Sequence, residues 1–366
     1  MREKETKMIE KLEKISNAFG PSGFEEEVVK TIAEFCTAYE TSNDTMNNLY
    51  IKHPANTGKK PVVMLDAHLD ECGFLVQAVK ENGLLSMLAL GGWDLTNIPA
   101  HSVIIRNRKG EKIKGITTSR PVHFMSEQER NAPLNMESIF IDVGASSKKE
   151  VEEVYGIYPG DPVMPDVSFE YHEKTGVCYG KAFDNRVGCT CILETMERLL
   201  KEKDLPVDVV GAFAAQEEVG TRGAEITTQT VKPDFAIVFE GSPADDFYYG
   251  KELAQGVLKK GVQIRHRDAS HITNPVFIQY AHELAEAKQI PYQDAVRRNG
   301  GTNAGKISLK LGPVPVLVLG IPSRYVHTHY NFCAKQDIDA AVALAVEVIK
   351  QLNQENQDRI TKKHLI

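Results

Sequence analysis

The chain has 366 residues, of which 42% are hydrophobic and 25% charged, and its formal net charge is −7 at pH 7. This length predicts two or three structural units, whereas the acidic balance argues against a nucleic-acid binder and the lack of a long apolar run argues against a membrane span. The first fifteen residues are dense in charge and contain no apolar stretch of the signal-peptide kind, so we expect a cytoplasmic protein.

The first 72 residues predict two helices followed by a buried strand. An amphipathic helix is expected up to about Ala18, and Ser22 and Glu25 have the spacing of a capping box at the start of a second helix. The run KPVVMLDAHLD, at residues 60–70, is short and largely apolar in its middle. Such a run is typical of a strand that is buried on both faces of a sheet.

From residue 73 to residue 166 the pattern changes to short alternating runs separated by turn signals, which is typical of a β-rich unit. One short helix interrupts this unit, where Ser147 and Glu150 form a second capping box. Strands and helices then alternate again from residue 167 to the end. We therefore predict an α/β fold with a mixed, largely parallel sheet flanked by helices, formed by residues 1–72 and 167–366, and an inserted β-rich domain at residues 73–166.

Side chains of the kind that bind metals follow four of the predicted strands. They are His68 and Asp70 after the first strand, Glu217 and Glu218 after VVGAFAAQ, Glu240 after AIVF, and His327 and His329 after VLVLGIP, with Asp184 just ahead of a helix. Sites in open α/β sheets form beyond the carboxyl ends of the strands, so these residues are expected to lie together. Adjacent carboxylates repel each other unless a cation or a shared proton separates their roles. Histidines and carboxylates in this number suit a pair of divalent ions such as zinc, cobalt or manganese.

A series of motifs resembles the glutamyl-aminopeptidase and tetrahedral-aminopeptidase family of di-metal exopeptidases. In chain order they are FGPSGFE, AHLDECGF, GGWD, IDVGASSKKEVEE, KAFDNRVG, AAQEEVGTRGA, FEGSPADD, GGTNAGKI and GIPSRYVH. The resemblance covers nearly the whole chain. It implies a metallo-aminopeptidase that removes N-terminal residues from short peptides, with two divalent ions per subunit, zinc or cobalt. It also implies that the insert is a dimerisation domain and that the dimers form a tetrahedral dodecamer.

The same resemblance implies a role for each metal-binding side chain. His68 and Glu240 would hold one ion, and Glu218 and His327 would hold the other. Asp184 would bridge the two ions. Such a pair of ions lowers the pKa of a shared water molecule and polarises the scissile carbonyl group.

Glu217 and Asp70 have catalytic roles by resemblance. Glu217 would be the general base, which takes a proton from the water and delivers it to the departing amine. Asp70 would orient His68 through the ring nitrogen that does not face the metal. We also expect Glu217 and Glu218 to point in different directions, because consecutive residues of a strand alternate between its faces.

Three positions depart from the family pattern. Glu240 stands where Asp is more usual, and Asn303 stands where Asp is common, close to the expected substrate site. The usual HSPVE motif is replaced by HTHYN, which places His329 two residues after His327. Two histidines therefore compete for one ligand position, and the position within the motif favours His327.

Two other activities are compatible with parts of this residue set. A metal-dependent deacylase of N-acyl amino acids would use the same two-metal site without a need for a free substrate amine. A glycosidase of the endoglucanase type would use paired carboxylates, but adjacent residues rarely place them on opposite sides of one sugar ring. Taken alone, His68 and Asp70 would be a structural pair and Asp184 a helix N-cap.

Overall fold

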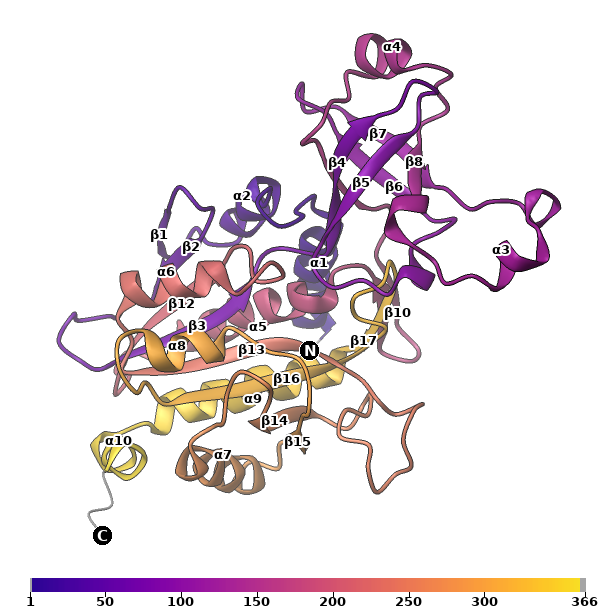
Figure 1. Cartoon of the computed structure of the whole chain (residues 1–366). Coiled ribbons are helices and arrows are strands. Elements are labelled where there is room, and N and C mark those ends of the chain that lie inside the picture. Colours follow the sequence, from indigo (N-terminus) through magenta and orange to yellow (C-terminus); the bar gives the residue numbers. More distant parts are fainter. Residues whose placement is uncertain (1, 363–366) are drawn as a thin grey trace.

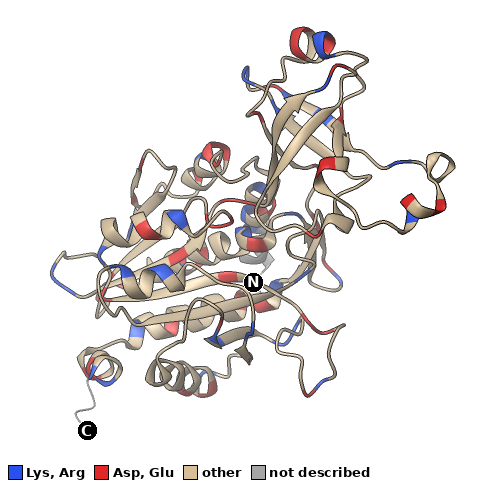
Figure 2. Cartoon of the chain, viewed as in Figure 1, with Lys and Arg blue, Asp and Glu red and all other residues tan. Residues whose placement is uncertain are grey.

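The computed structural model of the protein describes residues 2–362 and shows a layered α/β body that carries a small β-barrel (Figure 1). Lys and Arg are interspersed with Asp and Glu over the helices and loops of both parts (Figure 2). No helix among the described residues is both long enough and apolar enough to span a membrane.

An eleven-stranded mixed sheet forms the centre of the α/β body. Its main strand order is β1 (Glu40–Asn43), β2 (Leu49–Lys52), β12 (Asp208–Ala214), β3 (Val62–His68), β13 (Phe235–Pro243), β16 (Val316–Arg324), β17 (Asn331–Ala334), β11 (Val177–Gly180) and β10 (Glu170–His172). Strand β14 (Val262–Arg267) pairs with β16 and with β15 (Tyr292–Val296). The four central strands β12, β3, β13 and β16 are parallel, so their carboxyl ends meet at one edge of the sheet.

Helices cover both faces of this sheet. One face carries α1 (Arg2–Asn17), α2 (Glu26–Glu34), α5 (Phe183–Leu199), α7 (Pro275–Ala287), α9 (Lys335–Gln351) and α10 (Gln354–Thr361), and the other carries α6 (Arg222–Val231) and α8 (Ala304–Lys310). Strand β3 shows the two-sided burial that its sequence predicts. Val63, Leu65 and Ala67 pack into the larger hydrophobic cluster, whereas Met64 packs into the cluster on the opposite face.

The segment after β3 forms a separate closed barrel. Its strands, in barrel order, are β4 (Gly73–Val79), β5 (Leu85–Leu90), β8 (Phe140–Asp142), β7 (Lys112–Thr117), β6 (Ser102–Arg106) and β9 (Pro162–Pro165). The barrel has its own hydrophobic core, in which Phe74, Val103 and Ile141 are fully buried. The short helices α3 (Glu127–Asn131) and α4 (Lys148–Glu150) lie in its loops (Figure 1). The predicted fold class, a mixed α/β sheet with a β-rich unit inserted, is confirmed.

The two predicted capping boxes have different outcomes. Ser147 accepts a hydrogen bond from the backbone N–H of Glu150, as expected for a helix start. The box at Ser22 was wrong, because helix α2 begins at Glu26 and the Ser22 hydroxyl instead donates to Asp70 at 2.6 Å. The Ser22 hydroxyl thus donates to a carboxylate distant in sequence instead of accepting from an N–H group of the helix.

Candidate metal centre

The carboxyl ends of the central strands bring together all seven residues that the sequence predicts for the site. His68 is the last residue of β3, and the sheet register places it opposite Ala214, the last residue of β12. The remaining six residues lie in or beyond neighbouring elements: Asp70 beyond β3, Glu217 and Glu218 just beyond β12, Glu240 within β13, His327 beyond β16 and Asp184 at the start of α5. The chain therefore converges on one edge of the sheet from segments far apart in sequence.

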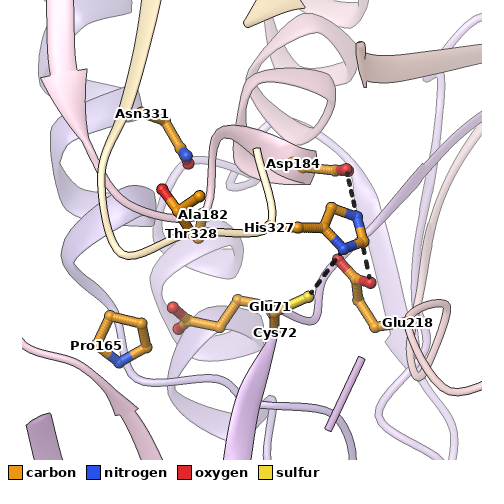
Figure 3. Close-up of a pocket in the computed structure, with 9 residues that line it drawn as sticks. All are labelled: Glu71, Cys72, Pro165, Ala182, Asp184, Glu218, His327, Thr328 and Asn331. Carbon is orange, nitrogen blue, oxygen red and sulfur yellow. Dashed lines mark hydrogen bonds and ion pairs between the residues drawn. The ribbon is translucent and has the colours of Figure 1, made fainter. Parts of the chain in front are cut away.

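Asp184 lies between the two histidines. Its Oδ1 is 3.0 Å from His68 Nε2, and its Oδ2 is 3.4 Å from His327 Nε2. The backbone of Asp184 and Asn185 is not helical, so the carboxylate lies ahead of the regular part of α5. Figure 3 shows Asp184 and Glu218 pointing at the ring of His327. One carboxylate therefore connects two clusters of possible ligands.

Each histidine also faces further carboxylates. His68 Nε2 is 4.0 Å from Glu217 Oε2 and 3.9 Å from Glu240 Oε1. His327 Nε2 is 3.7 Å from Glu218 Oε2. The ring of His327 is fixed from behind, because its Nδ1 lies 2.8 Å from the carbonyl oxygen of Gly92. The arrangement has two halves, one around each imidazole.

Asp70 organises the centre through its whole carboxylate. It accepts hydrogen bonds from the backbone N–H of Glu217 at 2.8 Å, from the backbone N–H of Glu218 at 3.1 Å and from the Ser22 hydroxyl. Its Oδ1 is 3.5 Å from His68 Nδ1, but its own backbone carbonyl oxygen is closer to that nitrogen, at 3.1 Å. The backbone of Asp70 therefore contributes as much as its side chain to orienting His68.

The two adjacent glutamates do not belong to a strand. Strand β12 ends at Ala214, and Gln216 has a positive φ of 56°, so the chain turns before it reaches Glu217. The expectation that strand alternation separates the two side chains was wrong. A turn held by the Asp70 carboxylate does so instead, with Glu217 toward His68 and Glu218 toward His327.

Three residues make contacts near the centre that the sequence did not predict. Ser22 and the buried Glu25 support the glutamate turn, since Glu25 Oε1 accepts from the backbone N–H of Gln216 at 3.2 Å. Cys72 lies in the AHLDECGF motif, and its Sγ is 3.5 Å from His327 Nδ1. Burial raises the pKa of the Cys72 thiol well above its ordinary value. All three residues lie in motifs that resemble the family pattern, but their contacts depend on tertiary structure.

Electrostatics indicate a site that requires positive charge. Burial raises the pKa of Glu217 to about 8 and the pKa of Glu218 to about 7, and it raises that of Glu240 well above its ordinary value. Although burial alone would lower the pKa of both histidines, the Asp184 carboxylate raises the pKa of His327 to about 10 and that of His68 well above its usual range. Both imidazoles are therefore protonated in this arrangement, and they supply the positive charge that the surrounding carboxylates require.

The donor set fits divalent transition metals. Ligand atoms of His68, Asp184 and Glu218 lie within 4.8 Å of one another, as do those of Cys72, Glu218 and His327. Imidazole nitrogens and carboxylate oxygens are ligands for zinc and cobalt, and a buried group of carboxylates is stabilised when such ions replace the protons.

His329 lies away from these ligands. It is 1% exposed, and its ring stacks on His101 with centroids 4.2 Å apart and also contacts Trp93. Burial and the neighbouring His101 lower the pKa of His329 to about 3, so the ring is neutral. Asn303, expected close to the substrate site, is buried and donates to Asp66 on β3 at 2.8 Å.

Two cavities meet beside the centre. The smaller is lined by Asp184, Glu218, His327 and Cys72, and by Pro165 from the barrel (Figure 3). The larger, of about 450 Å³, is lined mainly by aromatic side chains, among them His101, Tyr179, Tyr330 and Phe332. Thr328 lines both cavities, so the aromatic cavity adjoins the ligand cluster.

Known proteins resemble this chain over most of its length. The sequence model for the M42 glutamyl aminopeptidase family matches residues 47–344. The glutamyl aminopeptidase of Lactococcus lactis subsp. cremoris is 30% identical over 317 residues, which cover 87% of this chain and 88% of that protein.

Solved structures agree in fold as well as in sequence. A TET aminopeptidase from the marine sediment archaeon Thaumarchaeota archaeon SCGC AB-539-E09 is 33% identical, with a TM-score of 0.92 over 97% of this chain and 100% of that one. The TET1 peptidase of Pyrococcus horikoshii, which can assemble into a tetrahedron or a large octahedral shell, is 26% identical, with a TM-score of 0.83 over 94% of this chain and 100% of that one. With a match of this extent, the chain belongs to the M42 glutamyl aminopeptidase family and is a peptide-bond hydrolase of the aminopeptidase class.

Proposed function

We propose that this enzyme uses two divalent metal ions, zinc or cobalt, to remove N-terminal residues from short peptides. The observation that carries the proposal is the position of Asp184, whose two carboxylate oxygens face His68 on one side and His327 on the other. A carboxylate between two imidazoles is the arrangement that a bridging ligand requires. The additional carboxylates near each imidazole complete two ligand sets.

The proposal assigns the metal-binding side chains to two ions. His68 and Glu240 would hold one ion and Glu218 and His327 the other, with Asp184 shared between them. Glu240 is held for this task by Asn185, whose Nδ2 donates to its Oε2 at 3.2 Å. Ions bound there would supply an acidified water molecule and polarise the carbonyl group of the peptide.

Glu217 is the proposed general base. The backbone N–H of Glu217 is held by the Asp70 carboxylate. The Glu217 carboxylate faces His68 but stays 4.0 Å from its Nε2, which is too far for a hydrogen bond. Burial raises the pKa of Glu217 to about 8 in the metal-free site, and divalent cations bound nearby would lower it, so that the carboxylate could accept a proton near neutral pH. It would take the proton of the attacking water and pass it to the departing amine.

The barrel is the proposed assembly domain. Several large apolar side chains of this domain are exposed, namely Val122, Phe124, Leu134 and Val154. Apolar side chains that a single subunit leaves in water are suited to contacts between subunits. Together with the shells that the Pyrococcus relative forms, they support a homodimer formed through residues 73–166, and a dodecamer built from dimers. We also propose that the enzyme is located in the cytoplasm.

Matched substrates test the proposed reaction. A peptide with a free N-terminus should be cleaved, whereas the same peptide with an acetylated N-terminus should be stable. A deacylase of N-acyl amino acids would reverse this preference. Chelation should abolish the activity, and zinc or cobalt should restore it. Hydrolysis of a glucan that continues in chelator would indicate the glycosidase alternative instead.

A further inference from the structure

A second group of metal-binding side chains lies at the opposite side of the α/β body from the barrel. It consists of His266 in β14, His282 in α7 and Asp294 in β15 (Figure 1). None of these residues belongs to the centre described above. Their three ligand atoms lie within 4.8 Å of one another.

Both imidazoles converge on a single oxygen atom. His266 Nε2 and His282 Nε2 are each 2.7 Å from Asp294 Oδ1, and the two rings are inclined to each other with centroids 5.7 Å apart. Burial raises the pKa of Asp294, but the two histidines outweigh this effect and lower it below its ordinary value. The carboxylate is therefore ionised, and it faces two nitrogens that bind zinc when they are neutral.

The local fold fixes the three side chains in this position. The pairing of β14 with β15 contains a bulge: Arg265 pairs with Ala295, and the next pair is Arg267 with Val296. His266 is therefore the extra, unpaired residue of β14. Bulges of this kind re-aim a side chain out of the regular alternation of a strand. The ligands thus come from three different elements of secondary structure.

The ring of His282 is held by its own neighbour. It stacks on Tyr292 with centroids 5.0 Å apart, and the Tyr292 hydroxyl donates to Glu286 on the same helix as His282. Packing of this kind limits the orientations that the ring of His282 can adopt and so favours a preformed site.

We propose that His266, His282 and Asp294 hold a zinc ion, with a water molecule as its fourth ligand. Two imidazole nitrogens and one carboxylate oxygen form a common three-residue zinc set with an open position. Ligand atoms around a tetrahedral zinc lie roughly 3.4 Å apart. Each imidazole nitrogen therefore needs to move less than about 1 Å away from the Asp294 oxygen, from which it is now 2.7 Å distant. Their side chains are 35%, 25% and 51% exposed, which gives an ion a path from solvent.

Zinc at this position would connect α7 and β15 to β14. Strand β15 pairs with β14 alone among the described strands, so it is an edge strand held on one side. An ion that binds only the folded chain shifts unfolding to higher temperature. The expected effect is therefore to stabilise this edge of the sheet, and it is independent of peptide hydrolysis.

Metal analysis of matched variants tests this site. The full-length enzyme and the variants His282→Ala and Asp294→Asn are stripped with a chelator, loaded with zinc, and freed of unbound ion by gel filtration. We expect each variant to carry one zinc per subunit less than the wild type, with unchanged kcat/KM. The control His123→Ala removes an exposed histidine of the barrel and should keep the wild-type zinc content.

Two results would overturn the site. One is an equal zinc content in the wild type and in both variants. The other is a zinc affinity, measured by competition with a chelator, no tighter than millimolar. Thermal unfolding gives an independent readout, because zinc should raise the Tm of the stripped wild type by more than it raises that of Asp294→Asn. The comparison between wild type and variant does not depend on how many ions the catalytic centre holds, so failure of the two-metal proposal would leave it interpretable.

Discussion

The carboxylate of Asp70 accepts the backbone N–H of Glu217 at 2.8 Å. The second oxygen of the same carboxylate accepts the next N–H, that of Glu218, at 3.1 Å. One buried acid thus fixes the backbone of two further acids whose side chains diverge toward different histidines. The adjacency of the two glutamates follows from this turn, because each can serve a different half of the centre.

The two histidines of the HTHYN segment should differ in their effect on metal content. His327→Ala is expected to lose roughly half of the bound metal, because one of two ligand sets is damaged. His329→Phe should keep nearly all of it, since the ring of His329 stacks on His101 instead of facing the carboxylates. Metal analysis of both purified variants checks this. Equal losses would contradict the assignment of His327.

Charge placed on the exposed apolar surface of the barrel should disrupt assembly. Phe124 is 69% exposed, so Phe124→Asp should leave the subunit fold intact while it opposes a subunit interface. Light scattering should then report a smaller species than the wild type forms. Lys109→Asp, in the exposed β6–β7 turn of the same barrel, serves as the control for charge alone. A wild-type oligomer in Phe124→Asp would argue against this surface.

The sequence predicted the fold class and the cluster of site residues because both depend on local patterns. Buried strands have continuous apolar runs, and in a parallel sheet the residues just beyond them necessarily share one edge. The sequence could not predict that Ser22 donates to Asp70, that Glu25 supports the turn at Gln216, or that Asn303 binds Asp66. Each of these contacts joins segments whose distance in space is set by the packing of the whole domain.

The metal-free enzyme should lose stability as the pH rises from about 5 to 8. Burial raises the pKa of Glu217 to about 8 and that of Glu218 to about 7, whereas both titrate near 4.5 in an unfolded chain. Ionising them in the folded state therefore opposes folding across this window. The raised pKa of His327 acts in the same direction, since its bound proton stabilises the fold below pH 6.5 and is lost as the pH rises toward 10.

Tm measured against pH, with and without metal, checks this dependence. The chelated protein should show a falling Tm between pH 5 and 8. Zinc should remove the decline, because ions replace the protons and bind more tightly as the ligands deprotonate. A Tm of the chelated protein that stays constant or rises over this window would contradict the expected electrostatics.

The aromatic cavity beside the ligand cluster should select the substrate side chain. Its lining includes Tyr179, Tyr330 and Phe332 but no Lys, Arg, Asp or Glu among the described residues. Peptides that begin with Leu or Phe should therefore have a higher kcat/KM than those that begin with Glu or Lys, since a charged side chain would be desolvated without a partner. Tyr330→Ala should reduce this preference. A panel of aminoacyl-nitroanilides measures it, and a clear preference for Glu or Lys would show that the side chain binds elsewhere.

The central claim is that Glu217 moves a proton while Glu218 holds a metal ion, and Gln substitutions of the two residues form a matched pair. Metal content and turnover should be measured together for both variants. Glu217→Gln should keep its full metal content and lose activity by at least roughly 10²–10⁴-fold, because the amide cannot accept a proton. Glu218→Gln should lose metal measurably. Metal loss in Glu217→Gln with full retention in Glu218→Gln would show that the roles are reversed, and full activity in both variants would contradict the proposed mechanism.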